Sequence, residues 1–289
     1  MLAHIASLPR AARRGLENLG GKSGAKNRQV HRAEATHNQD MNETRIALIT
    51  GANKGIGLQI AKELANHGLA ILIGSRDLER GRAAAKEVGR GARAVQLDVT
   101  SSPSITAAAE WIRKECGRLD VLVNNAGISN SPAPDASFED LLAMARPSVV
   151  PLDEVRVVFE TNVFGVLAVT QALLPLLREA SAGRIVNVSS EVGSLARQGD
   201  PNNPYRMANG SYSPSKTALN ALTVAFANEL DGSRIKVNSV CPGFTATDLN
   251  RFRGSRTVEQ GARAAVHCAM LDETGPSGGF FDEAGPLPW

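Results

Sequence analysis

From residue 45 to the end of the chain, short apolar runs alternate with longer amphipathic stretches. The amphipathic stretches carry apolar residues at helical spacing, whereas the short runs are rich in β-branched and aliphatic residues. Strands and helices that alternate in this way form βαβ units with parallel strands. We therefore predict an α/β fold: a three-layer, doubly wound parallel sheet of about seven strands with helices on both faces. The expected strands are 45–50, 70–74, 92–97, 120–124, 184–188, 235–240 and, more weakly, 279–281. The expected helices are 55–67, 77–88, 103–116, 151–180, 212–231 and 257–270.

The first forty residues differ from the rest of the chain in composition. Residues 1–40 carry seven basic and three acidic side chains, whereas the remaining residues carry 25 basic and 26 acidic ones. We predict a basic, disordered N-terminal extension over 1–42 and one domain over 43–289, which carries both the cofactor site and the substrate site. The extension is interpreted in three ways: a targeting segment, an arm for nucleic acid or membrane, or the product of a start codon upstream of Met41.

Composition excludes several classes of function. The chain is 43% hydrophobic and 21% charged, which is typical of a soluble globular protein. No apolar run reaches the roughly 18 residues of a membrane-spanning helix. The three cysteines have no CxxC spacing and the histidines form no HExxH pair, so we expect no metal site and a reducing, cytoplasmic location. We expect no nucleic-acid or membrane partner for the body of the chain.

A glycine-rich turn joins the first expected strand to the first expected helix. Residues 50–57 read TGANKGIG, with Gly51, Gly55 and Gly57 as the glycines. Glycines allow a tight turn and let backbone N–H groups approach a pyrophosphate, next to the positive end of the helix dipole. At the first βα junction, this pattern indicates the dinucleotide-binding loop of a Rossmann fold. The spacing is GxxxGxG rather than the commoner GxGxxG.

Two cations near this turn indicate which dinucleotide binds. Arg76 follows the second expected strand, at the position where an acidic residue would hold the ribose 2′-hydroxyl of NAD. An arginine there suits the 2′-phosphate of NADP(H), and Lys54 adds a second cation. Asp77 is interpreted as the cap of the following helix. We therefore expect NADP(H), with NAD less favoured.

Tyr212 and Lys216 stand four residues apart on an expected helix, so their side chains share one face. An ammonium beside a phenol favours the phenolate, and we expect it to lower the tyrosine pKa and to prepare proton transfer. Ser189 and Ser190 end the fifth expected strand, and residues 124–127 (NNAG) end the fourth. Ligand-binding groups of open α/β sheets gather at such carboxyl ends.

Taken together, these motifs resemble the short-chain dehydrogenase/reductase family, and in particular its NADP(H)-dependent carbonyl-reductase-like members. The match covers about residues 45–281, with the motifs in the family's order and at nearly its spacing. The matching positions are Thr50–Gly57, Asp98-Val99, Asn124–Gly127, Asn162, Ser190, Tyr212 with Lys216, and Pro242-Gly243.

The resemblance implies a role for each position. Tyr212 would be the general acid in reduction and the base in oxidation, and Lys216 would tune it and bind the nicotinamide ribose. Ser190, rather than Ser189, would orient the substrate oxygen, and Asn162 would support Lys216 through a proton relay. The implied cofactor-binding residues are Gly51, Asn53, Lys54, Gly55, Ile56, Gly57, Arg76, Asp98, Val99, Asn125, Ala126, Gly127, Tyr212, Lys216, Pro242, Gly243, Thr245 and Thr247.

Two departures from the family pattern concern the substrate side. Ser190 and Tyr212 are 22 residues apart where most members have about a dozen, so we expect the extra segment 199–210 to border the substrate pocket. A longer insertion here accompanies monomeric carbonyl reductases, so monomer and homo-oligomer both stay open. Thr245 replaces an aliphatic residue, which predicts a different polarity on the substrate side.

The predicted function is hydride transfer between NADP(H) and a small-molecule carbonyl or secondary alcohol. A non-catalytic NADP(H)-sensing binding protein is the alternative, although it predicts an incomplete catalytic set. An epimerase or dehydratase on the same fold is disfavoured by the GxxxGxG spacing. The substrate itself is not readable from the sequence.

Overall fold

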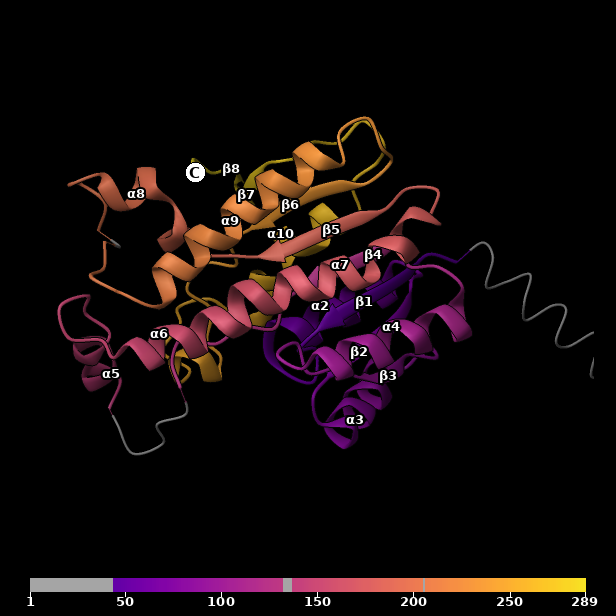
Figure 1. The fold of residues 1–289 in the computed structure, drawn as a ribbon, viewed down its shortest axis with the longest axis horizontal. Helices are drawn as coiled ribbons and strands as arrows, with labels where there is room; N and C mark the ends of the chain where they lie inside the picture. The colour runs from indigo at the N-terminus through magenta and orange to yellow at the C-terminus, as the bar shows by residue number, and fades with distance from the viewer. Residues whose placement is uncertain (1–43, 132–136, 205) are drawn as a thin grey trace, which may run out of the picture. The chain divides into compact units, whose positions relative to one another are not determined.

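A computed structural model describes residues 44–131, 137–204 and 206–289. The extension predicted over 1–42 therefore lies outside the described residues, and so does residue 43, the first of the predicted domain. Arg45–Trp289 form one compact unit built on a single sheet. Figure 1 shows that sheet sandwiched between two layers of helices, as the alternating pattern predicted.

The sheet has eight strands within the described residues, in the order β3-β2-β1-β4-β5-β6-β7-β8. The strands are β1 Ile46–Thr50, β2 Ala70–Ser75, β3 Arg93–Gln96, β4 Val121–Asn124, β5 Arg184–Val188, β6 Lys236–Val240, β7 Phe280–Asp282 and β8 Gly285–Pro286. β1 to β7 pair in parallel, whereas β8 pairs antiparallel with β7. The expected count of about seven was one too low, because a tight turn after Asp282 returns the chain along the sheet edge. The carboxylate of Asp282 accepts the N–H groups of Ala284 and Gly285 in that turn.

The order reverses between β1 and β4, which lie side by side at the centre of the sheet. Strands on either side of this point lead to helices on opposite faces, so a crevice opens at their carboxyl ends. The helices are α2 Gly55–Asn66, α3 Leu78–Val88, α4 Ser102–Cys116, α5 Phe138–Met144, α6 Leu152–Phe159, α7 Gly165–Arg178, α8 Leu195–Gly199, α9 Tyr212–Glu229 and α10 Val258–Ala269. Three short helical turns, η1 Glu160–Phe164, η2 Glu191–Gly193 and η3 Asp248–Asn250, complete the set.

The core forms because alternate strand side chains point to opposite faces of the sheet. Ile49 and Ile73 point to one face and are fully buried there against Ile60 and Leu64 of α2 and against residues of α10. Figure 1 shows α4, α7 and α9 lying over the other face. A sheet covered on both faces explains the almost continuous apolar character of the strands.

The stretch expected as one helix over 151–180 is helical from Leu152 to Arg178, with the π-helical turn η1 in its middle. Of the described helices, this span alone is long and apolar enough to cross a membrane by length and composition. Half of its most apolar window is buried in the fold, as expected of a helix that packs on a sheet.

The extra segment expected over 199–210 lies beside the connection between α5 and α6. The N–H of Gly210, at the end of the extra segment, donates to the carbonyl of Ala145, just after α5 (2.8 Å). A Cβ on Gly210 would lie 2.8 Å from the side chain of Val150. The segment after α8 therefore packs on the connection between α5 and α6.

Candidate active site

The glycine-rich turn at the carboxyl end of β1 has the backbone shape that its sequence predicted. Gly51 and Gly55 adopt φ values of +64° and +59°, a region that favours glycine. A Cβ on Gly57 would lie only 2.4 Å from Nδ2 of Asn125 and 2.9 Å from the carbonyl oxygen of Gly51. The three glycines therefore keep the turn free of side chains, which leaves a cradle that a dinucleotide fits.

The end of β4 braces this turn. Oγ1 of Thr50 accepts the N–H groups of Asn125 and Ala126, each at 3.0 Å. In return, Nδ2 of Asn125 donates to the carbonyls of Thr50 (2.9 Å) and Gly51 (3.3 Å). These four bonds join the first and fourth strands at the switch point, so the cradle is preformed.

The first turn of α2 follows directly on the glycine-rich turn. Lys54 is the cap residue of α2, and no described side chain caps the helix. Asn53 is half-buried in the turn, and Ile56 packs against the core, which anchors the start of the helix. The uncapped N–H groups of such a helix start suit a phosphate.

Arg76 and Lys54 differ in their surroundings. Arg76 is exposed directly after β2 and, among the described residues, makes no ion pair or hydrogen bond. Lys54 pairs with the carboxylate of Asp248 at 3.0 Å. Asp77 caps α3 by accepting the N–H of Arg80, as predicted. Arg76 is thus free to meet a phosphate, whereas Lys54 already has an anionic partner.

Asp98 and Val99 follow β3 at the same edge of the sheet. The Asp98 carboxylate accepts the N–H and the hydroxyl of Thr100, at 3.0 and 2.8 Å. A Cβ on Gly165 would lie 2.8 Å from the carbonyl of Val99, so this turn packs against the start of α7.

Asn162 is fully buried in the π-helical turn η1. Its Nδ2 donates to the carbonyl of Ile128 (2.8 Å) and to Oγ of Ser215 (3.0 Å), while its Oδ1 accepts the N–H of Ile128 (2.9 Å). A Cβ on Gly127 would lie 3.2 Å from Oδ1 of Asn162 and 3.5 Å from Nζ of Lys216. The glycine therefore keeps the space between these two side chains open.

Tyr212 and Lys216 share one face of α9, as their spacing predicted. The Lys216 ammonium lies 5.6 Å from the centre of the Tyr212 ring and donates to the carbonyl of Val188, at the end of β5 (2.8 Å). Lys216 is 5% exposed and Tyr212 is half-buried. The pair thus lies at the carboxyl ends of the central strands.

The structure distinguishes the two serines that follow β5. Ser189 is fully buried, and its hydroxyl lies 3.4 Å from the carbonyl of Lys216. Ser190 caps the turn η2, and its hydroxyl lies close enough to the phenol of Tyr212 to lower the pKa of the phenol. Ser190 is therefore the serine that faces the tyrosine.

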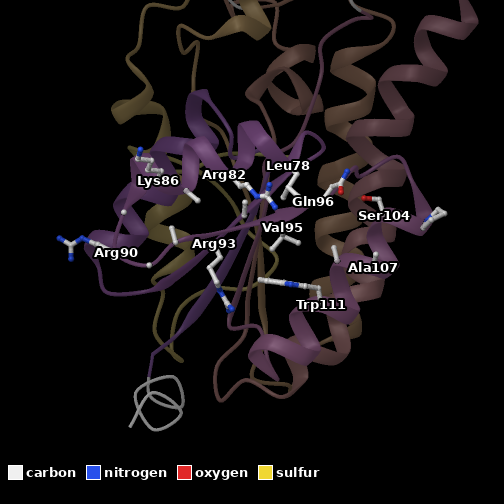
Figure 2. A pocket seen from close by; sticks show the side chains of 17 residues that line it. Leu78, Arg82, Lys86, Arg90, Arg93, Val95, Gln96, Ser104, Ala107 and Trp111 are labelled. Carbon is white, nitrogen blue, oxygen red and sulfur yellow. The ribbon is translucent and has the colours of Figure 1, made fainter. Parts of the chain in front are cut away.

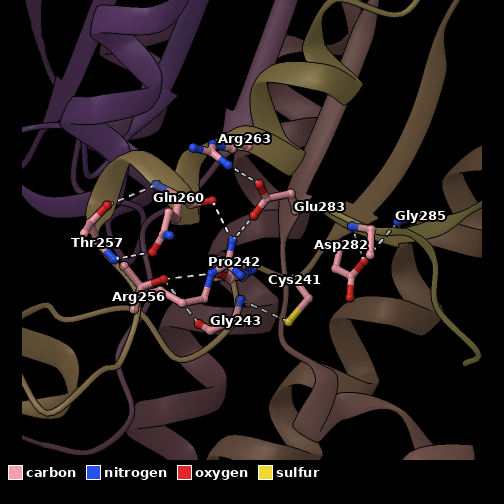
Figure 3. A network of polar contacts seen from close by, with 12 residues as sticks. Cys241, Pro242, Gly243, Arg256, Thr257, Gln260, Arg263, Asp282, Glu283 and Gly285 are labelled. Atoms are coloured by element: carbon pink, nitrogen blue, oxygen red, sulfur yellow. Dashed lines mark hydrogen bonds and ion pairs between the residues drawn. The ribbon is translucent and has the colours of Figure 1, made fainter.

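The turn after β6 is part of a network of polar contacts (Figure 3). Gly243 has φ +71°, and a Cβ there would lie 2.6 Å from Cδ of Arg256. The Arg256 guanidinium donates to the carbonyl of Gln260 (3.1 Å) and pairs with Glu283, which also pairs with Arg263. The backbone of Pro242-Gly243 is therefore supported by α10 and by the β7–β8 turn.

Thr245 and Thr247 play different parts in this turn. Thr245 is buried, and its hydroxyl donates to the carbonyl of Pro242 at 3.1 Å. The expectation that Thr245 changes the polarity on the substrate side is therefore wrong, because the hydroxyl is used within its own turn. A Cβ on Gly55 would lie 3.6 Å from the methyl group of Thr247, so Thr247 borders the glycine-rich turn.

A family model described as short chain dehydrogenase matches residues 45–257, most of the chain. The chain belongs to the short-chain dehydrogenase family. The resemblance drawn from the motifs is thereby confirmed, as is the Rossmann-type fold.

Named relatives of this short-chain dehydrogenase include reductases. Short-chain dehydrogenase/reductase 1 of Saponaria officinalis is 34% identical over an alignment that covers 83% of this chain and 94% of the relative. Carbonyl reductase [NADPH] 3 of Rattus norvegicus is 35% identical, with 81% and 95% covered. Among solved structures, salutaridine reductase from Papaver somniferum has a TM-score of 0.69 at 30% identity, with 83% and 99% covered. An NADPH-bound carbonyl reductase from chicken fatty liver has the same TM-score at 27% identity, with 85% and 99% covered.

Electrostatics in this short-chain dehydrogenase differ from the expectation for Tyr212. Burial raises the pKa of Tyr212 above its ordinary value, negative charge on an ionised Cys241 would raise it further, and the nearby Ser190 hydroxyl opposes the rise. Burial also lowers the pKa of Lys216 to about 8. The expected lowering of the tyrosine pKa is thus wrong, because loss of water around the phenol is the largest influence on it and disfavours the phenolate.

Three contributors to the site were missed by the sequence analysis. Cys241 accepts the N–H groups of Glu191 (3.2 Å) and Gly243 (3.4 Å), so its sulfur joins the Ser190 turn to the turn after β6. Burial raises the pKa of its thiol to about 11, so it stays neutral. Asp248 contributes by pairing with Lys54, and Arg256 by pairing with Glu283, and both partners are distant in sequence. Of the three residues, only Cys241 could have been found from the sequence, because it directly precedes Pro242 of the matching motif.

Proposed function

We propose that this short-chain dehydrogenase transfers a hydride between NADP(H) and a carbonyl or secondary alcohol. The observation that carries the proposal is the convergence of Asn162, Ser190, Tyr212 and Lys216 at the carboxyl ends of β4 and β5, beside a glycine cradle that fits a dinucleotide. A protein that only senses the ligand needs the cradle alone and does not need a tyrosine, a serine and a lysine gathered at the same strand end.

The cofactor would lie across the switch point, from the free cation at β2 to the turn after β6. Arg76 would bind the 2′-phosphate, since an arginine matches phosphate geometry and this one is unpaired among the described residues. Names of relatives that contain NADPH agree with this choice. The residues proposed to hold the cofactor are the eighteen positions named in the sequence analysis, with Thr245 acting through the turn that it closes.

The proton chemistry follows from the electrostatics of Tyr212. With its pKa raised by burial, the phenol carries its proton at neutral pH, and it would donate that proton to the carbonyl oxygen as hydride addition makes that oxygen strongly basic. Ser190 would hold that oxygen beside the phenol, since its hydroxyl already lies near the phenol and acts on the pKa of Tyr212. The bound nicotinamide supplies the hydride.

Lys216 and Asn162 would replace the proton that Tyr212 gives up. With a pKa of about 8, the buried Lys216 can gain or lose a proton near neutral pH. Asn162 is hydrogen-bonded to Ile128 and to Ser215 of α9. Gly127 leaves space between Asn162 and the Lys216 ammonium, because it has no side chain there. A relay from Lys216 past Asn162 to solvent would then recharge the tyrosine.

The decisive experiment mixes the full chain with NADPH and a panel of ketones and aldehydes and follows the loss of nicotinamide absorbance. We expect turnover with at least one carbonyl, and a higher kcat/KM with NADPH than with NADH in a parallel series. Tight NADPH binding without turnover on any carbonyl or, in reverse, any secondary alcohol would favour the sensing protein instead.

The remaining assignments are proposals of the same kind. We propose that residues 43–289 are one catalytic domain, that this domain works in the cytoplasm on a small-molecule carbonyl or alcohol, and that it needs no nucleic acid or membrane. Removal of residues 1–40 should then leave kcat and KM unchanged. Sedimentation would decide between monomer and homo-oligomer.

A further inference from the structure

A cavity of about 1100 Å³ runs along the outer edge of the sheet, between α3, β3 and α4 (Figure 2). The catalytic side chains do not line it. Four basic side chains, Arg82, Lys86, Arg90 and Arg93, line the cavity, and the lining residues include no aspartate or glutamate.

The floor of the cavity is the edge of β3, whose outward backbone groups pair with no other strand among the described residues. β3 pairs with β2 on one side and is the last strand of the sheet on the other. The N–H of Leu97 donates to Ser75 of β2 (2.9 Å), so in a parallel ladder the backbone groups of Ala94 and Gln96 point away from β2. Such an edge offers donors and acceptors to one further strand.

The walls of the cavity leave room for that strand. Ala85 of α3 faces the cavity from one side, and Ala107 and Ala108 of α4 face it from the other. A Cβ added to Gly89 or to Gly91 would meet no atom within 4 Å, so the end of the cavity is open. An added strand needs a spacing of about 4.8 Å from β3.

The charges of the cavity are only partly neutralised. Arg82 pairs with Glu79 (2.5 Å), and Arg93 pairs with Glu115 (3.5 Å) while its guanidinium lies 4.9 Å from the centre of the Trp111 ring. Lys86 and Arg90 make no ion pair with any described residue. An occupant of this edge must therefore be acidic.

This charge argues against two occupants from the protein itself. A second copy that paired its own β3 here would bring four cations against four others. The leading residues 1–40 are also basic, with seven cations against three acids. Like charges placed opposite each other across a strand pair are unfavourable, so the occupant comes from elsewhere.

We propose that this edge binds an extended acidic peptide segment of a partner protein, which adds a strand to β3. Its backbone pairs with Ala94 and Gln96, and its carboxylates meet Lys86 and Arg90. The site is separate from the proposed reaction, so its test stands whether or not the enzyme turns over carbonyls.

The test uses Trp111 as a reporter. The chain has two tryptophans, so Trp289→Phe leaves Trp111 as the only one. An eight-residue peptide that alternates valine and glutamate is titrated at low salt, beside a peptide with lysine in place of glutamate. We expect a saturable change in Trp111 fluorescence with the acidic peptide alone, weakened at least about tenfold at high salt. No saturable change would overturn the proposal.

Two further experiments test where the peptide binds and whether its backbone pairs with β3. Lys86→Glu with Arg90→Glu should weaken binding at least about tenfold, whereas Lys114→Glu, on α4 outside the cavity, should change it less than about twofold. N-methylation of alternate peptide residues should abolish binding, with the protein itself unchanged. Equal binding of the methylated peptide, or of a single-stranded oligonucleotide, would show a general polyanion surface and overturn strand addition.

Discussion

The ammonium nitrogen of Lys216 lies 5.6 Å from the centre of the Tyr212 ring, one turn away along α9. Its hydrogen bond goes to the carbonyl of Val188, 28 residues earlier in the chain. The lysine is thus anchored to the end of β5 rather than to the phenol. Because Ser190 follows β5 by two residues, this anchor brings the Lys216 side chain from α9 to the strand end that also positions Ser190.

Replacing Tyr212 with phenylalanine should lower kcat by about a hundredfold or more, because proton transfer by a positioned side chain contributes a factor of this size. The ring stays, so NADPH binding should remain within about threefold of the wild type. Steady-state kinetics and a fluorescence titration with NADPH measure the two effects. Activity close to that of the wild type would contradict the proposed role of Tyr212.

Replacing Lys216 with methionine should change how stability depends on pH. Burial lowers the pKa of Lys216 to about 8, whereas an unfolded lysine titrates near 10.4. The folded chain therefore carries a penalty below pH 8 that disappears as the pH rises toward 10.4. Between these values, the free energy of unfolding of the wild type should rise by up to about 3 kcal/mol relative to the variant.

Urea denaturation of both proteins at pH 7, 8, 9 and 10 checks this prediction. The comparison has to be a difference between the two proteins, because buried thiols act in the opposite direction. The raised pKa of Cys241, about 11, makes stability fall as the pH increases, and it does so equally in both. Parallel curves for wild type and variant would mean that Lys216 titrates normally.

Two variants should move the cofactor preference in opposite directions. Arg76→Ala should raise KM for NADPH about tenfold and leave KM for NADH within about twofold, because NADH lacks the 2′-phosphate. Asp248→Asn removes the partner of Lys54, which lies 3.0 Å away, and should lower KM for NADPH a few-fold. Kinetics with both cofactors measure the shifts, and an equal change for NADPH and NADH would argue against a phosphate contact.

Replacing Gly193 with alanine should disturb the alignment of Ser190 with α9. A Cβ there would lie 2.7 Å from the carbonyl carbon of Lys216, a backbone atom that cannot move alone. We expect a loss of about 1–3 kcal/mol in the free energy of unfolding and at least a tenfold loss in kcat. Gly199→Ala is the matched control, since a Cβ there meets nothing within 4 Å. Equal effects of the two changes would contradict the contact.

Much of the fold was predictable because local patterns determine it. The spacing of apolar residues predicts the strands and helices. Asp77 marks the start of α3, because it is the capping residue directly before the helix. β8 was missed because two residues, Gly285 and Pro286, carry no periodic signal. The π-helical turn η1 was also missed, since it continues a helical pattern that looks uniform in sequence.

The identities of the proposed site residues came from spacing, but their electrostatics did not. Tyr212 and Lys216 share a helix face because four residues make about one turn, and this spacing is visible in the sequence. The direction of the Tyr212 pKa shift could not be found this way, because it depends on how much water surrounds the phenol once distant segments pack around it.

The sequence by itself therefore determined the family, the order of the elements and the residues with reactive groups, all of which are encoded at short range. The tertiary structure alone decided which groups meet: Lys54 with Asp248, Cys241 with Glu191, and Arg256 with Glu283. It also left the β3 edge open and positively charged. Contacts of this kind depend on the relative positions of whole strands and helices, and a local pattern carries no information about them.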